Sequence, residues 1–135
     1  MVEILLYLAK HCAFLFRPGW FRFVDSRVDE SFGGDAYVVL ASDSLRLRFV
    51  RDCGQLLLDF QSTERTGEKH WFSIDVVQRL ITGEKRPSAE LDAEYAAFLE
   101  ENLTDIERRF GQNNLSETVK TLRELERVRA KELFG

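Results

Sequence analysis

Four segments between residues 20 and 62 alternate apolar and polar side chains, and very short turns join the last three of them. The segments are WFRFVDS (20–26), DAYVVLAS (35–42), SLRLRFVRD (44–52) and GQLLLDFQS (54–62). Alternation with a period of two is typical of a strand that buries one face. Strands joined by turns as short as Ser42-Asp43 and Asp52-Cys53-Gly54 must run antiparallel and lie side by side. The sequence therefore predicts a four-stranded antiparallel meander.

The turns also predict the register of these strands. A two-residue first turn pairs Leu40 with Leu45 and places both on the face that is to be buried. At the next turn, a bulge at Gly54 would direct Leu57 inward, whereas regular pairing directs Phe60 inward, and we expect regular pairing. The predicted inner face holds Phe21, Phe23, Ala36, Val38, Leu40, Leu45, Leu47, Phe49, Leu56, Leu58 and Phe60. The predicted outer face holds Arg22, Val24, Tyr37, Val39, Arg46, Arg48, Val50, Leu57 and Asp59.

Helical patterns flank the predicted sheet on both sides in the sequence. They cover residues 2–16, a segment from Ser73 as N-cap to Gly83 as C-cap, residues 88–110, and a segment from Asn114, with Glu117 in the reciprocal capping position, to about Leu133. A chain of 135 residues is long enough to bury a core within one domain. We expect a single domain over residues 1–135 with an α+β fold: an N-terminal helix, the four-stranded antiparallel meander, then three helices ending in an αα-hairpin.

Charge is segregated between the last two predicted helices. Residues 88–107 hold seven acidic residues and no Lys or Arg, whereas residues 108–135 hold seven basic and four acidic ones. The acidic edge consists of Glu90, Glu94, Glu101 and Asp105, and the basic edge of Lys120, Arg123, Arg127 and Lys131. The two edges can face each other in a hairpin, or the acidic edge can face outward and dock a basic partner.

Arginine recurs at alternate positions in LRLRFVRD (45–52). Such a row is typical of the solvated face of a half-covered sheet. Alternatively, Arg22, Arg46 and Arg48 could bind phosphates while Tyr37 stacks on a base. The apolar residues on the same predicted face favour partial cover by a helix or by another protein. The candidate interaction residues are Arg22, Tyr37, Arg46, Arg48, Leu57, Glu90, Glu94, Glu101 and Asp105.

The sequence shows no motif for catalysis, metal binding or nucleotide binding. Neither His11 nor His70 has a Cys or a second His at ligand spacing, and Cys12 and Cys53 match no metal or redox spacing. We therefore predict no catalytic residue, no metal site and no cofactor, and interpret both cysteines as free thiols.

Four carboxylates lie on or beside one loop of the predicted meander. They are Asp25, Asp29, Glu30 and Asp35, and Phe32 lies between them. Carboxylates so arranged could hold Mg²⁺ or Ca²⁺, but a solvated connecting loop has the same composition. We interpret the segment as a recognition loop or a connector.

A net charge of −4 gives no overall attraction to nucleic acid or to an anionic membrane. The apolar segment 2–16 is too short to span a bilayer, and Glu3 stands where a signal peptide would carry basic residues. These features predict a cytoplasmic protein without membrane association.

The succession FRFVDSR, LRLRFVRDCGQLLLDFQS and WFSIDVVQRLITG, followed by a helical tail, resembles the layout of small bacterial proteins of the toxin-immunity kind. The resemblance implies a cytosolic protein that binds a cognate toxin and has no enzymatic activity. We expect a non-enzymatic protein-binding protein that acts through an open sheet face or the acidic helix edge.

Two alternatives remain open: a nucleic-acid-binding regulator that uses the arginine row, and an enzyme that uses the loop carboxylates. The first predicted helix has apolar residues on two sides. This pattern predicts either a homodimer or burial of the helix between the sheet and the C-terminal helices.

Overall fold

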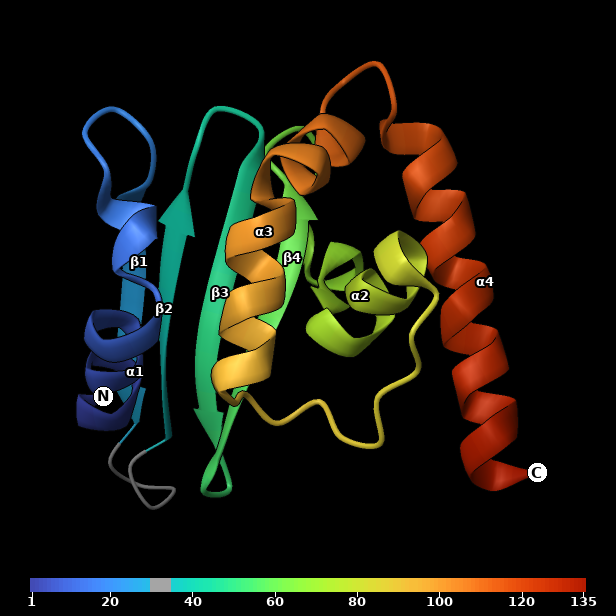
Figure 1. The fold of residues 1–135 in the computed structure, drawn as a ribbon, viewed down its shortest axis with the longest axis horizontal. Helices are drawn as coiled ribbons and strands as arrows, with labels where there is room; N and C mark the ends of the chain where they lie inside the picture. Colours follow the sequence, from blue (N-terminus) through green and yellow to red (C-terminus); the bar gives the residue numbers. More distant parts are fainter. Residues whose placement is uncertain (30–34) are drawn as a thin grey trace.

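The alternating segments form one antiparallel sheet in the computed structural model, which describes residues 1–29 and 35–135. The strands are β1 (Arg22–Asp29), β2 (Asp35–Ala41), β3 (Leu45–Asp52), β4 (Gln55–Ser62) and β5 (Phe72–Ser73), and they lie in chain order (Figure 1). The α+β fold is confirmed, but the predicted number of strands is wrong. Phe72 and Ser73, which immediately precede a helix, pair with Phe60 and Asp59 and add a fifth strand.

The predicted register of the first turn is wrong by two residues. Leu40 pairs with Leu47 rather than with Leu45. The turn is centred on Asp43 and Ser44, because the Ser42 N–H donates to the Leu45 carbonyl oxygen at 2.9 Å. A shift of two residues leaves every side chain on its predicted face, since the side-chain period of a strand is two.

The second turn has the regular pairing that the sequence favours. Asp52 pairs with Gln55 across the two-residue turn of Cys53 and Gly54. Both turn residues have positive φ, 50° and 82°, as a tight turn that follows the twist of the strands requires. Leu58 and Phe60 are therefore in the core, where Phe60 stacks on Phe110.

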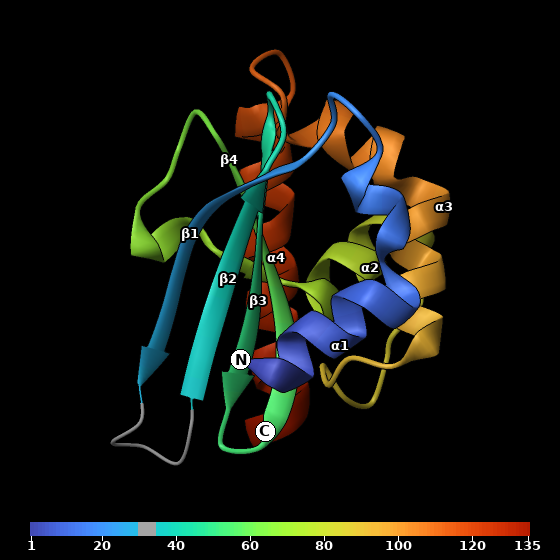
Figure 2. The same cartoon turned by 90° about the vertical axis from the view of Figure 1, so that its left-hand side faces the viewer.

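The helices are α1 (Val2–His11), α2 (Ile74–Thr82), α3 (Ala93–Phe110) and α4 (Leu115–Phe134), and η1 (Ala13–Phe16) and η3 (Glu68–His70) are short 3₁₀ turns. Figure 2 shows α1, α2 and α3 on one side of the sheet and the segment that contains η3 on the other. No helix in the described part of the chain has the length and apolar content to cross a membrane.

Two predicted helix boundaries are corrected. The first α-helix ends at His11 instead of continuing to residue 16, because Cys12 leaves the helical conformation with a φ of −124°, and η1 follows. The third helix begins at Ala93 instead of residue 88. Asp92 caps it by accepting a hydrogen bond from the Tyr95 N–H at 2.8 Å, and residues 83–92 form a linker.

The predicted αα-hairpin is not formed as a packed pair. In Figure 1, α2 lies between α3 and α4, which approach each other only near their connection, where the Thr118 hydroxyl donates to the Arg109 carbonyl oxygen at 2.7 Å. None of the ion pairs among the described residues joins α3 to α4. The Asn114 side chain makes no N-cap hydrogen bond and instead donates to the Arg108 carbonyl oxygen. The acidic and basic edges of the last two helices therefore do not face each other, and they do not determine how α3 and α4 are aligned.

Candidate interaction surface

The arginine row is partly covered by its own chain. The segment that follows β4 returns over the outer face of the sheet (Figure 2) and brings Trp71 against Arg46 and Arg48. The Arg48 guanidinium lies 4.4 Å from the centre of the Trp71 ring. It also donates to Asp59 at 2.9 Å and to Glu68 at 3.3 Å. The prediction of an open sheet face is therefore wrong at Arg48, whose side chain is only 21% exposed.

The covered arginines also have hydrogen-bond partners within the chain. Arg46 donates to Gln61 at 3.0 Å. Burial raises the pKa of Asp59 above its ordinary value, and the hydrogen bond from Arg48 opposes that rise. Since each nitrogen of the Arg48 guanidinium already donates to Asp59 or Glu68, Arg48 would have to exchange these contacts to bind a phosphate, and Arg46 would have to leave Trp71 or Gln61.

The other candidates on the outer face do not join the two arginines in one cluster. Tyr37 donates its hydroxyl hydrogen to Asp25 at 3.2 Å, and Leu57 is half-buried opposite Val50. Arg22 is exposed at the start of β1. The outer face is thus divided between a covered part at β3 and β4 and an exposed part at β1.

The predicted acidic edge is divided in a similar way. Glu90 lies in the linker rather than on α3, and Glu94 approaches Arg86 at 3.7 Å. Asp105 binds Arg108 and Arg109 of its own helix. Burial by itself would raise the pKa of Asp105, but the two arginines lower it below its ordinary value. Glu101 is exposed beside the hollow between α2 and α3.

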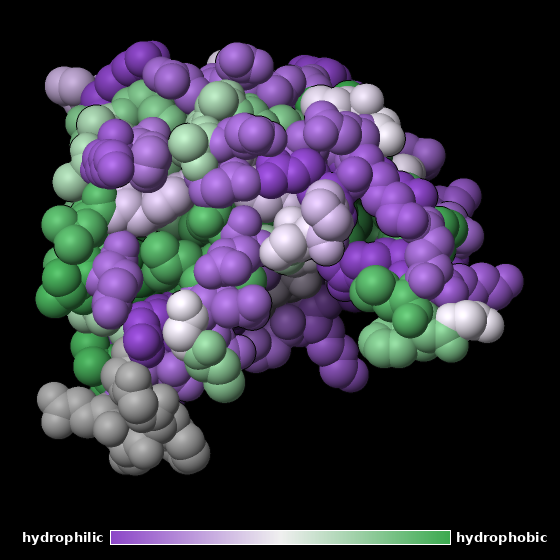
Figure 3. All heavy atoms as spheres, turned by 60° about the horizontal axis from the view of Figure 1, so that its bottom comes forward, coloured by the Kyte–Doolittle hydropathy of each residue, from purple (hydrophilic) through white to green (hydrophobic). Residues whose placement is uncertain are grey.

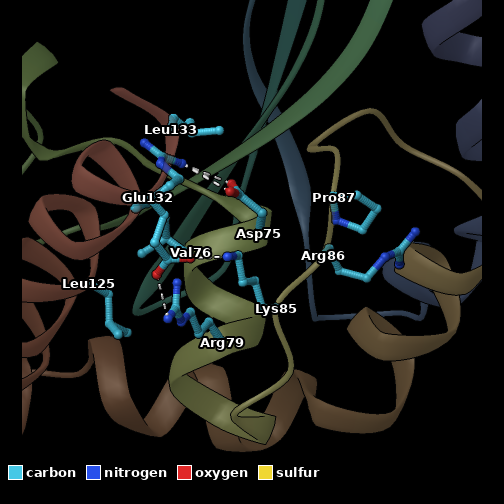
Figure 4. A pocket seen from close by; sticks show the side chains of 10 residues that line it. Asp75, Val76, Arg79, Lys85, Arg86, Pro87, Leu125, Glu132 and Leu133 are labelled. Carbon is cyan, nitrogen blue, oxygen red and sulfur yellow. Dashed lines mark hydrogen bonds and ion pairs between the residues drawn. The ribbon is translucent and has the colours of Figure 1, made fainter. Parts of the chain in front are cut away.

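A charged hollow between α2, α4 and the linker is closed by ion pairs (Figure 4). Arg129 binds Asp75 at 3.1 Å, while Glu132 accepts hydrogen bonds from both Arg79 and Lys85. Most of the charge that lines this hollow is thereby neutralised within the chain. The arrangement anchors α4 to α2, which explains how α4 is held although it packs little on α3.

The largest group of exposed apolar side chains lies at the other end of the sheet. We call it the α1–β1 edge, and it consists of Val2, Leu5, Leu6, Phe16, Phe23, Val24 and Val28. Figure 3 shows it as a hydrophobic area on the side of the molecule formed by α1 and β1. Phe16 stacks on Phe23 with ring centres 5.4 Å apart, and a groove of about 410 Å³ runs from Leu5 to Val24.

This edge is exposed because no other element of residues 1–29 and 35–135 lies beyond β1. Helix α1 packs its buried side over β3 and leaves a groove between Leu5 and the helix-facing side of β1. Phe23 pairs with Leu40 and faces the same way, yet it is 56% exposed, whereas Leu40 is completely buried. The expectation that Phe23 belongs to the core is therefore wrong. A bulge between Phe23 and Asp25 further bends the strand away from its neighbour.

None of the candidate interaction residues chosen from the sequence belongs to this edge. The signal that pointed to it was the first helix, whose apolar residues occupy two sides. Tyr7 and Leu8 are buried under the sheet, while Leu5 and Leu6 are left on the surface. Alternation in β1 gave the wrong answer because it shows which residues share a face but not whether that face is covered.

The described residues bring no catalytic or metal-binding constellation together. No group of three or more His, Cys, Asp and Glu side chains within residues 1–29 and 35–135 could hold a metal ion. Of the loop carboxylates, Asp25 bonds to Tyr37 and Asp35 to the Cys53 N–H, whereas Glu30, like Phe32, lies outside the described residues. Burial raises the pKa of the Cys12 thiol to about 12, and a hydrogen bond to Asp52 raises that of Cys53, so neither thiol is activated.

Comparison with known proteins gives no relative: no protein-family model, no curated protein and no solved structure matches the chain.

Proposed function

We propose that this is a non-enzymatic protein-binding protein and that its contact surface is the α1–β1 edge. The observation that carries the proposal is the exposure of seven large apolar side chains on three adjoining elements, α1, η1 and β1. Apolar area of this kind gains about 25 cal/mol per Å² when a partner removes it from water. Contiguous apolar patches on soluble proteins mark contact sites, whereas single exposed apolar residues do not.

The surroundings of the α1–β1 edge support a protein partner. The apolar side chains are bordered by charged residues of both signs on β1, namely Arg22, Asp25 and Arg27, all of them exposed. An apolar centre with a charged rim is the ordinary anatomy of a protein interface. The edge strand also presents backbone hydrogen-bonding groups, which a partner strand or loop can use.

We extend the proposal to location and partner class through the resemblance to toxin-immunity proteins. In this proposal the protein acts in the cytoplasm and its partner is a cognate toxin, or a second copy holds the surface until the toxin arrives. The exposed acidic residues Glu94 and Glu101 would then attract a basic partner and raise the rate of encounter.

The experiment uses two matched leucines on helices. Leu6 lies on the α1–β1 edge and is 63% exposed, and Leu133 lies near the end of α4 and is 66% exposed. We expect immobilised wild type and Leu133→Lys to retain the same cytosolic partner from the source cell, identified by mass spectrometry, and Leu6→Lys to lose it. Equal retention by all three proteins would contradict the proposed surface.

The arginine row offers less support for nucleic-acid binding. The donors of Arg48 are occupied by Asp59 and Glu68, and its ring partner is Trp71 rather than a free base. Binding to phosphates would show a steep dependence on salt. We expect a flat titration with oligonucleotides at low salt, and salt-sensitive binding that Arg46→Glu removes would reverse the preference.

A further inference from the structure

Strand β1 has one side without a partner. It is the first strand of the sheet, and among the described residues β2 is its only neighbour. The Ser42 N–H donates to the Leu45 carbonyl oxygen, so the even-numbered residues of β2 form the backbone hydrogen bonds to β3. Because backbone bonds alternate along an antiparallel pair, β2 uses Val39 and Tyr37 toward β1. Their partners on β1 are Asp25 and Arg27, so the backbone groups of the residues between and beyond them point away from the sheet.

The Ser26 amide confirms this alternation. Its N–H donates to the carboxylate of the preceding Asp25 at 2.9 Å rather than to a carbonyl of β2. The Ser26 C=O and the Val28 N–H and C=O therefore point toward a further strand, to which the Ser26 N–H can also donate once it exchanges its local bond to Asp25.

The sequence of this free edge is complementary to itself. Residues 24–28 read Val-Asp-Ser-Arg-Val. When two copies of this segment run antiparallel and Ser26 faces Ser26, each Asp25 faces an Arg27, and each Val28 comes opposite the bulge that contains Val24. Both charged residues are exposed, and the described residues give neither of them an oppositely charged partner within the chain. The opposed pairs thus supply a partner for each charge.

We propose that β1 pairs antiparallel with β1 of a second copy of this chain, with the two-fold axis at Ser26. This inference rests on the proposed function and names the occupant of the α1–β1 edge. The axis is perpendicular to the sheet, so the two helical layers lie on the same side of a continuous sheet. The apolar groove beside Leu5 and Phe23 then meets the same groove of the partner.

The fold also limits the assembly to two copies. The other edge of the sheet is β5, which has only two residues and leads directly into α2. It offers too little free strand for a further copy. A contact that uses the same patch on both subunits closes on itself, so the product is a dimer rather than a filament.

The experiment measures the mass of the full chain by multi-angle light scattering from low to high micromolar concentration. We expect the mass to rise from 15.7 kDa toward twice that value. Arg27→Asp places a negative charge opposite Asp25 at both symmetric positions of the dimer. We expect the dimer Kd to rise about tenfold or more, which corresponds to roughly 1.4 kcal/mol. The double variant Asp25→Arg/Arg27→Asp restores opposite charges, and we expect its dimerisation to return to the wild-type level.

Two further variants separate pairing from folding. Lys120→Asp makes the same change of net charge on α4 and should leave the dimer intact. Ser26→Pro removes an N–H that β2 does not use, and proline is tolerated on the free side of an edge strand. We expect Ser26→Pro to give a folded monomer with a wild-type circular dichroism spectrum.

Two results would overturn the inference: a mass of 15.7 kDa at every concentration, or a dimer that neither Arg27→Asp nor Ser26→Pro affects. A monomeric chain whose cytosolic partner is lost in Leu6→Lys would overturn the self-pairing and leave the proposed function standing. Retention of that partner by Leu6→Lys would instead contradict the proposed function, so the two failures are distinguishable.

Discussion

The two ends of the sheet contain similar alternating sequences but have opposite environments. At the β4–β5 end, Phe60 and Phe72 are buried because α2, α3 and the segment after β4 cover both faces. At the β1 end, Phe23 and Val28 remain exposed because α1 leaves a groove beside Leu5 instead of packing on β1, and no other described element lies beyond β1. The difference shows that alternation determines which side chains share a face, whereas the length and placement of other elements determine whether the face is buried.

The largest expected effect compares one residue type at the two ends. Phe60→Ala removes a completely buried ring that stacks on Phe110, and we expect a loss of about 3 to 5 kcal/mol in the free energy of unfolding. Phe23→Ala removes a ring that is mainly in water, and we expect a loss of about 1 kcal/mol or less from its contact with Phe16. Urea denaturation at a concentration that keeps the chain monomeric measures both. Equal losses would show that the β1 end is as well packed as the other.

A second prediction removes the cover from the arginine row. Trp71 is half-buried against Arg46 and Arg48, and we expect Trp71→Ala to reduce the free energy of unfolding by about 2 kcal/mol. Trp71→Phe keeps an aromatic ring over the guanidinium groups and should recover more than half of that loss. If Trp71→Ala were as stable as wild type, the segment after β4 would not be a fixed cover.

A third prediction concerns the linker that borders the covered side of α1. Asp92 caps α3 and binds Arg86, and its backbone carbonyl accepts a hydrogen bond from Tyr7 at 2.7 Å. We expect Asp92→Ala to cost about 1 kcal/mol at neutral pH, the usual effect of losing an N-cap, and Asp92→Asn to cost less because an amide oxygen can still cap.

The pH dependence of this loss has a definite sign. Burial by itself would raise the pKa of Asp92, but the Tyr95 N–H and Arg86 lower it below its ordinary value. A carboxylate with a lowered folded-state pKa contributes stability above its unfolded-state pKa and loses it as the pH falls through the folded-state value. The difference in urea stability between wild type and Asp92→Asn should therefore shrink toward zero in acid. A difference that grew on acidification would contradict the assigned contacts.

The smallest expected effect is at the open end. Leu6→Lys places a charge on a side chain that is already exposed, and we expect the free energy of unfolding of the monomer to stay within about 0.5 kcal/mol of wild type. The same substitution is expected to abolish partner capture, so stability and binding separate at this residue. A loss of several kcal/mol would show that Leu6 supports the fold.

The sequence predicted the central meander well because tight turns and alternation act over a few residues. The faces of β3 and β4 and the pairing across Cys53 and Gly54 follow from local geometry. The two-residue error at the first turn had no effect on the faces, since it was even. The bounds of helix α2 were predicted correctly because the residues that mark them, Ser73 and Gly83, lie next to it in the sequence; Gly83 caps the helix in the left-handed conformation, whereas the Ser73 side chain makes no capping hydrogen bond.

The candidate site was predicted poorly because it depends on elements that are distant in the sequence. Nothing near Arg48 in the chain shows that Trp71 will return to cover it. The charge segregation between the last helices suggested a hairpin, yet α2 lies between them and anchors α4 through Asp75 and Arg129. The exposure of Phe23 follows only from the absence of a further strand or helix beyond β1 in the described fold.

Amide hydrogen exchange along β1 at increasing protein concentration tests the central claim most directly, because it reports on each backbone N–H. We predict that the Ser26 and Val28 amides exchange rapidly in dilute solution and become protected as the concentration rises. The Arg27 amide faces β2 and serves as an internal control that is protected throughout. Rapid exchange of Ser26 and Val28 at every concentration, with Arg27 protected, would contradict the self-pairing of β1.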